Sequence, residues 1–318
     1  MELEATLPRW RALSQHLRAV RIRLDRAGLR SGSLGTGGAG AIWTGPAAKR
    51  CWRVLADLGP ALSSAALGLD LMSERLAAHA SEQRRVSLAT PSMTVLRSSA
   101  VGDGRWVGRT GHRSAPVVVL LIPGVGTDVG DRVELRRDAV RTWEQLAIEA
   151  ERSRVGQDEV AVVSWLGYDP PDNVVAGLAR APARDGARQL VTDVAALRSS
   201  GAQRVVVVGH SYGALVATHG SAAGMAADEL VLLGAPGLGV AGRDALHLPR
   251  GADLWAAAAT GDLVSAIATP GWLHGPDPVP LARALPTSMW GHGAYLDDPL
   301  LLDGLAALTL HDPDAPRP

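Results

Sequence analysis

Several residue types are scarce in this sequence, and each scarcity excludes a class of protein. Only one of the 318 residues is a cysteine, Cys51, so the chain can form neither an internal disulfide nor a cysteine-rich metal site. No apolar run reaches 18 residues, which argues against a transmembrane segment. The opening residues MELEATLPRW lack an apolar stretch, so a cleaved secretory signal is not expected. These absences favour a globular protein that is cytoplasmic by default, with non-classical export left open.

An excess of charge of either sign is also lacking. The net charge is +0 at pH 7, which argues against a nucleic-acid partner. Residues 1–84 carry 12 Lys or Arg and 7 Asp or Glu, whereas residues 85–318 carry 20 and 25. This asymmetry indicates two domains, an N-terminal one over 1–84 and a second one over 85–318.

The N-terminal domain has the pattern of an α-helical hairpin. Apolar residues recur at helical spacing at Leu13, Leu17, Val20 and Leu24. Six glycines over 28–41 predict a loop, and a second helical run follows from Pro46. Cys51 lies on the apolar face of that run, which favours a packing role over a reactive one.

The turn of this hairpin contains a Trp-x-Gly triplet, Trp43 to Gly45. Two helices joined by such a turn resemble the WXG-type helical hairpins associated with specialised bacterial secretion. The resemblance implies a secretion or protein partner for the hairpin. A tryptophan that packs in the core before a proline-started helix is the alternative interpretation.

From residue 93 onward, β-branched runs alternate with helical patterns, which predicts a doubly wound, mostly parallel sheet of the α/β class. Two segments, 93–97 and 105–109, are expected to form an opening antiparallel pair. We expect a buried strand over 117–122, further strands over 160–165, 204–208 and 230–233, and a weaker final strand over the alanine-rich 254–260. Helices are expected over 133–152, around 187–197 and over 298–310.

The strand ending at Val208 runs into Gly209-His210-Ser211-Tyr212-Gly213, and a helix of small residues follows. A serine on so tight a turn is strained, and side chains two residues before or after it would collide with neighbouring backbone. Strand, sharp turn and helix in this order resemble the nucleophile elbow of the α/β-hydrolases, which makes Ser211 the expected nucleophile.

A serine nucleophile needs a base, and the base needs an acid that orients it. His292, in a loop just before the last helix, is the expected base, with His274 as the rival. Asp262, after the alanine-rich strand, is the expected acid. Asp277 is the alternative acid, and a helix N-cap is the alternative role for Asp262.

The oxyanion formed on attack needs backbone donors. We expect the N–H groups of Tyr212 and Val125, with Gly124 and Gly126 letting the backbone approach substrate. Three further side chains are candidates for substrate contact: His210, Trp165 and Tyr168. A plain structural turn is an equal alternative for the segment that holds Trp165 and Tyr168.

Five blocks occur in order along residues 93–310: PGVGT, WLGYDPP, GHSYG, LLGAPG and GHGAY. Together they resemble a group of bacterial α/β-hydrolases whose members can carry an N-terminal helical segment. The resemblance implies the doubly wound hydrolase fold and the Ser211, Asp262 and His292 triad. Only about 20 residues separate the strands over 230–233 and 254–260, so any cap must be small.

These observations predict a serine hydrolase, independent of metal and cofactor, that cleaves an ester-like bond in a small-molecule acyl substrate through an acyl-enzyme. An esterase or lipase-like activity is expected, with thioesters and amides left open. The alternative function is a secretion-associated or partner-binding protein, in which the hairpin is the working surface and the hydrolase domain is a scaffold.

Overall fold

The computed structural model describes residues 12–13, 15–16, 19, 63, 65–70, 91, 93–99, 104–268, 271 and 273–311. The chain divides into two units, Met1–Ser87 and Leu88–Pro318. Described residues of the first unit are helical, and Ala66 is buried. The hairpin as a whole, its Trp43 to Gly45 turn and Cys51 lie outside the described residues. Among the residues described, no helix has the length and apolar character needed to cross a membrane.

The second unit holds eight strands and five longer helices in its described part. The strands are β1 Met93–Ser99, β2 Arg105–Gly111, β3 Val117–Ile122, β4 Val160–Leu166, β5 Arg204–His210, β6 Glu229–Leu233, β7 Asp253–Ala257 and β8 Arg283–Ala284. The helices are α3 Arg132–Arg152, α4 Ala181–Ser199, α5 Tyr212–Ala222, α6 Leu263–Ala268 and α7 Pro299–Leu310. Short 3-10 turns fill several connections, including η4 Ala176–Leu178 and η7 Tyr295–Asp297.

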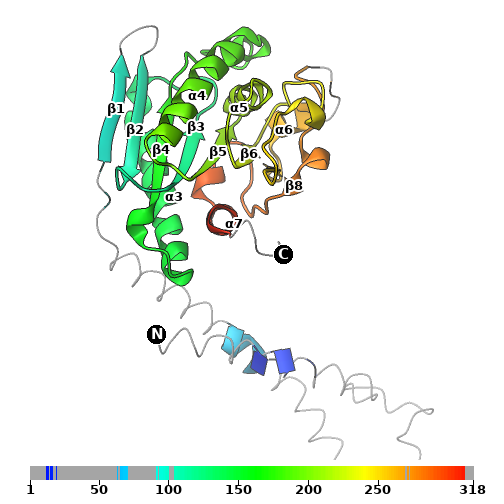
Figure 1. The fold of residues 1–318 in the computed structure, drawn as a ribbon. Coiled ribbons are helices and arrows are strands. Elements are labelled where there is room, and N and C mark those ends of the chain that lie inside the picture. Colours follow the sequence, from blue (N-terminus) through cyan, green and yellow to red (C-terminus); the bar gives the residue numbers. More distant parts are fainter. Residues whose placement is uncertain are drawn as a thin grey trace, which may run out of the picture. The chain divides into compact units, whose positions relative to one another are not determined.

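The strands form a single sheet in the order β1-β2-β4-β3-β5-β6-β7-β8 (Figure 1). β1 and β2 pair antiparallel, and β2 also pairs antiparallel with β4. Every other pairing is parallel. This arrangement confirms the predicted α/β-hydrolase fold, including its opening antiparallel pair. Because the central strands are parallel, their carboxyl ends meet at one edge, where ligands bind in sheets of this class.

Alternate residues of each central strand enter two separate cores. Val118 and Leu120 of β3 pack toward α4 and α5, whereas Val119 and Leu121 pack toward α3 and α7. The period of two places one helix pair on each face of the sheet (Figure 1). The continuous apolar runs of β3 and β5 follow from this burial on both faces.

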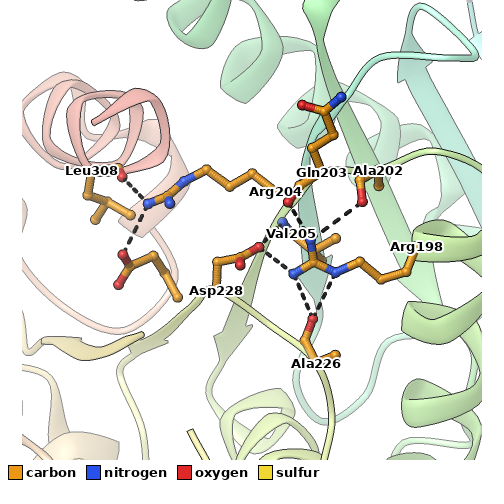
Figure 2. Close-up of polar contacts among 9 residues, drawn as sticks. Arg198, Ala202, Gln203, Arg204, Val205, Ala226, Asp228 and Leu308 are labelled. Carbon is orange, nitrogen blue, oxygen red and sulfur yellow. Dashed lines mark hydrogen bonds and ion pairs between the residues drawn. The ribbon is translucent and has the colours of Figure 1, made fainter. Parts of the chain in front are cut away.

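The amino ends of β5 and β6 are linked to the helices by arginines (Figure 2). Arg198 of α4 donates to the backbone oxygens of Gln203 and Ala226 and to the Asp228 carboxylate. Arg204 donates to Leu308 O of α7 at 2.9 Å and to buried Glu229 at 3.0 Å. These contacts join β5 to α4 on one face of the sheet and to α7 on the other.

Candidate active site

Ser211 lies directly after β5, at the edge where the carboxyl ends of the parallel strands meet. Its backbone has φ 55° and ψ −124°, a conformation that L-residues rarely adopt. A Cβ added at Gly209 would lie 2.6 Å from Ala214 Cα, and one at Gly213 would lie 2.5 Å from Pro123 O. Both flanking positions therefore require glycine, for the steric reason that the sequence indicated.

The serine turn is held by its own backbone. Ser211 N–H donates to Leu233 O at 2.8 Å, and Ala214 N–H donates to Ser211 O at 3.0 Å. Tyr212 is the first residue of α5, so its N–H belongs to the turn of the helix that has no intrahelical acceptor. The side chain of Tyr212 points elsewhere, because its hydroxyl donates to Ala179 O and accepts from Ala183 N–H.

Asp262 and His292 lie side by side at the same edge. His292 Nδ1 is 2.9 Å from Asp262 Oδ1. A carboxylate only accepts, so Nδ1 carries the ring proton and Nε2 keeps its lone pair. Among the described residues, His292 Nε2 is buried and has no hydrogen-bond partner. A nitrogen in this state can accept a proton.

A local extension of the sheet brings these two residues together. Beyond β7, Thr260 forms a parallel bridge with Trp290, and Gly291 N–H donates to Thr260 O at 2.9 Å. Asp262 follows the first partner by two residues and His292 follows the second by two. The backbone pairing therefore brings Asp262 and His292 close to one another.

Further donors surround the Asp262 carboxylate. Oδ1 accepts from the N–H groups of Val264 and Ser265, which makes Asp262 the N-cap of α6. Oδ2 accepts from Ser265 Oγ at 2.7 Å and from Tyr295 OH at 2.5 Å. Burial alone would raise the pKa of Asp262, but the hydrogen bonds from Tyr295, His292 and Ser265 outweigh it and lower this pKa to about 2. Asp262 thus has the N-cap role and contacts His292 as well.

The loop after β3 runs against the serine. A Cβ at Gly124 would lie 2.7 Å from Ser211 Cβ, so only glycine fits there. Gly126 has φ +71°, and its N–H donates to Pro171 O at 2.8 Å. The N–H of Gly126 is therefore occupied, and the residue shapes the loop. Between the two glycines, Val125 borders the same cavity as Ser211.

Trp165 and Tyr168, the other two candidates for substrate contact, are not among the residues that border the Ser211 cavity. Trp165 is wholly buried and donates through Nε1 to Asp193 at 2.8 Å. Tyr168 is buried between the rings of Trp165 and Tyr212, and its hydroxyl donates to Pro123 O at 2.8 Å. Through the Tyr168 hydroxyl, the stack is attached to the backbone of the loop after β3.

His210, which was expected to contact substrate, points at His292 and is not among the residues that border the cavity. Its Nε2 lies 2.9 Å from His292 O, so this nitrogen donates. The two imidazole rings are 4.9 Å apart. Burial, and then the neighbouring His292 imidazole, which opposes a second positive charge beside it, lower the pKa of His210 to about 4. A neutral His210 therefore supports the loop that carries His292.

The two rival residues lie in different surroundings. His274 borders the Ser211 cavity, but its Nδ1 is buried without a hydrogen-bond partner in the described part of the chain. Burial, and then Arg180, lower the pKa of His274. Asp277 accepts from Val279 N–H at 2.9 Å, as a turn-forming aspartate does. Neither has the carboxylate–imidazole contact that Asp262 and His292 make.

A family model described as alpha/beta hydrolase matches residues 90–271, more than half of the chain. The chain belongs to the α/β-hydrolase family. The matched segment of this hydrolase contains Ser211 and Asp262 and ends before His292.

Curated relatives of the hydrolase are mycobacterial. The uncharacterized protein Rv2079 of Mycobacterium tuberculosis is 31% identical over 173 residues, which are 52% of this chain and 26% of that protein. Rv0963c, also uncharacterized and from M. tuberculosis, is 32% identical over 177 residues, 53% of this chain and 63% of that protein. The match thus spans only a quarter to under two thirds of these relatives.

Solved structures include hydrolases of low identity. A structural study of two fungal esterases from Rhizomucor miehei gives 13% identity and a TM-score of 0.43, over 73% of this chain and 88% of that one. A dienelactone hydrolase from Anabaena variabilis gives 19% identity and a TM-score of 0.41, over 69% and 95%.

In this hydrolase, the cavity beside Ser211 is small and mostly apolar. Its volume is about 80 Å³. Ser211 and His292 border it together with Val125, Val174, Gly177, Leu178, Tyr212, Pro236, Val264, Leu273 and His274. The apolar side chains come from five segments: the loop after β3, the segment that contains η4, the loop after β6, the start of α6 and the loop after α6. An apolar group of a few heavy atoms would be surrounded on several sides here.

Proposed function

We propose that this hydrolase is a serine esterase that acts through an acyl-enzyme on an ester-like small molecule. One observation carries the proposal. The strained Ser211 and an imidazole already oriented by a carboxylate border the same cavity. Strain in a non-glycine residue persists where the surrounding structure imposes it, and such residues cluster at active sites.

The orientation of each group suits one step of ester hydrolysis. Ser211 Oγ attacks the carbonyl carbon while His292 Nε2 takes the hydroxyl proton. His292 then gives this proton to the leaving alcohol as the carbon–oxygen bond breaks. Water then attacks the acyl-enzyme and loses a proton to His292. The carboxylic acid product leaves as Ser211 takes this proton back from His292. Asp262 stabilises the imidazolium that forms in both halves of the cycle.

Two backbone N–H groups are our candidates for the oxyanion hole. Tyr212 N–H comes from the first turn of α5, next to the attacking oxygen. Val125 N–H comes from the loop that Gly124 allows to run against Ser211. Donors fixed in this way stabilise the negative oxygen without having to reorganise during the reaction.

We assign the active site to the cavity at Ser211 because of the groups that border it, although it is not the largest cavity. A larger one of about 620 Å³ is bordered by Arg105, Asp169, Asp185, Arg188 and other residues, but it holds no serine beside an oriented imidazole. The small apolar cavity at Ser211 favours an ester with a short acyl group. We therefore expect acetyl and butyryl esters to be cleaved faster than octanoyl esters.

Covalent labelling tests the nucleophile. The full chain is treated with a fluorophosphonate, whose phosphorus accepts an activated serine oxygen as fluoride leaves, and the adduct is read by intact mass. One adduct is expected for the wild type and none for Ser211→Ala. Ser221→Ala is the matched control, because Ser221 is a buried serine of α5 that does not border the cavity.

The outcomes separate the alternatives. Labelling that persists in Ser211→Ala would place the reactive residue elsewhere. A folded wild-type protein that takes no label would contradict the proposal as a whole. If Ser211 is labelled, p-nitrophenyl esters of two, four and eight carbons then test the acyl preference, and a fastest octanoyl ester would refute the short-chain expectation.

A further inference from the structure

Tyr295 makes two buried hydrogen bonds at the back of the site. It lies in η7, three residues after His292, and it is 2% exposed. Its hydroxyl oxygen is 2.8 Å from Ala259 N and 2.5 Å from Asp262 Oδ2. Tyr295 thus joins the loop of the base to the turn that carries the acid. It does not border the Ser211 cavity.

The direction of both hydrogen bonds is fixed by proton count. A phenol has a single proton, and a backbone N–H can only donate. Ala259 N–H therefore gives its hydrogen to the phenol oxygen, and the phenol hydrogen goes to Asp262. Burial, and then the contact with Asp262, raise the pKa of Tyr295 to about 12, so the phenol keeps this proton at neutral pH.

The contact divides the two carboxylate oxygens between two tasks. Oδ2 receives the hydroxyls of Tyr295 and Ser265, whereas Oδ1 receives His292 and two backbone N–H groups. A carboxylate held at both oxygens cannot rotate about its bond to Cβ. Oδ1 then stays directed at His292 Nδ1.

Packing at Gly234 shows how closely this corner is filled. Gly234 follows β6 and has φ +58°. A Cβ there would lie 2.8 Å from Asp262 Oδ2, 2.9 Å from Tyr295 Cε2 and 3.0 Å from His292 Cε1. Position 234 therefore accepts only glycine, and it packs against all three side chains. The backbone leaves them little room to rearrange.

We propose that Tyr295 is a positioning residue, which holds Oδ2 of Asp262 so that Oδ1 keeps His292 in its reactive orientation. The inference rests on the proposed function, because it assigns Tyr295 a part in activating Ser211. Tyr295 acts through Asp262 and touches neither substrate nor the reacting oxygen.

A double-mutant cycle tests the coupling. The full chain is prepared as wild type, Tyr295→Phe, Asp262→Asn and the double variant. Two readouts are measured on each: the second-order rate of fluorophosphonate labelling, and kcat and KM for a p-nitrophenyl ester. Tyr295→Phe is expected to lower the labelling rate and kcat about tenfold with KM within twofold, and to have less than a twofold effect when Asp262 is already asparagine.

Tyr168→Phe is the matched control, because it also deletes a buried phenol that donates one hydrogen bond at 2.8 Å, to Pro123 O. Its effect, of whatever size, should be the same factor in both Asp262 backgrounds. All variants are compared below their unfolding transitions. An equal Tyr295→Phe factor in both backgrounds, or no change in labelling, would overturn the inference. Failure of the wild type to label would instead refute the proposed function.

Discussion

The two ends of β5 are built in opposite ways. At the amino end, Arg204 and Arg198 donate to carboxylates and backbone oxygens of neighbouring elements (Figure 2). At the carboxyl end, Ser211 has a strained backbone, and the nearby His292 Nε2 is buried without a partner among the described residues. The difference lies along one strand: polar contacts join the amino end to its neighbours, whereas the carboxyl end holds a strained backbone and an imidazole nitrogen that we propose to be reactive.

Loss of the base gives the largest expected effect and acts only at the carboxyl end. His292→Ala should lower kcat on the order of 10⁴-fold or more, because it removes the imidazole that Asp262 orients and that we propose takes the serine proton. The free energy of unfolding should change by less than about 1 kcal/mol, since Asp262 Oδ1 keeps two backbone donors. Hydrolysis of a p-nitrophenyl ester and urea unfolding measure the two quantities. A variant that is several-fold less active would show that His292 is not the base.

Loss of the arginine at the amino end should have the reverse effect. Arg204→Met leaves the 2%-exposed Glu229 without this cation, so we expect the free energy of unfolding to fall by about 3 kcal/mol. The kcat/KM of the folded protein should stay within twofold. Arg188→Met is the control, since its pair with Asp185 is largely exposed and should contribute less than about 0.5 kcal/mol. Equal destabilisation by the two variants would show that burial of the pair has no special weight.

From the sequence, the positions of the strands could be predicted better than the directions of the side chains. Apolar runs placed the buried strands to within a few residues, because burial on both faces leaves a continuous pattern. The predicted strand over 254–260 ends instead at Ala257, and the two-residue β8 was missed, since neither alanine nor so short a segment gives a strong signal.

Side-chain directions could not be predicted in the same way. His210 and Tyr168 have the right types for substrate contact and lie next to the right motifs. Their hydrogen bonds to His292 O and Pro123 O depend on pairings between distant segments. Tyr295 was overlooked although it ends the GHGAY block, three residues after His292. A tyrosine so near a candidate base is a signal that sequence reasoning can use.

The pH dependence of the free energy of unfolding tests the carboxyl end of β5 through His210, the last residue of that strand. Its pKa of about 4 in the folded protein is below the ordinary value of 6.5, because burial and the neighbouring His292 oppose protonation. Asp262 acts in the opposite direction and is outweighed, and the Tyr295 ring also faces His210. Between pH 6.5 and 4 the unfolded chain therefore binds a proton that the folded chain does not, so stability falls as pH falls, by up to about 3 kcal/mol.

His210→Asn removes this contribution while leaving the other histidines in place. Urea unfolding at pH 7.5 and pH 4.5 should show a smaller loss of stability for the variant than for the wild type. Asp262 does not interfere, because its pKa of about 2 places its own loss of stability below about pH 4. Parallel losses in the two proteins would show that His210 titrates normally in the folded state.

The smallest expected effect concerns the backbone of Ser211 itself. At φ 55° and ψ −124° a side chain is unfavourable, and glycine is not. Ser211→Gly should relieve about 1–3 kcal/mol of strain, from which the greater entropy of a glycine in the unfolded chain subtracts about 0.5–1 kcal/mol. Ser211→Ala keeps the Cβ and so keeps the strain. Both variants lack the Ser211 hydroxyl, so thermal unfolding compares two proteins that differ only in the Cβ. Greater stability of the glycine variant, by about 1 kcal/mol, would locate the strain in the backbone of the nucleophile. Equal stability would mean that the carboxyl end of β5 differs from the amino end in its polar contacts alone.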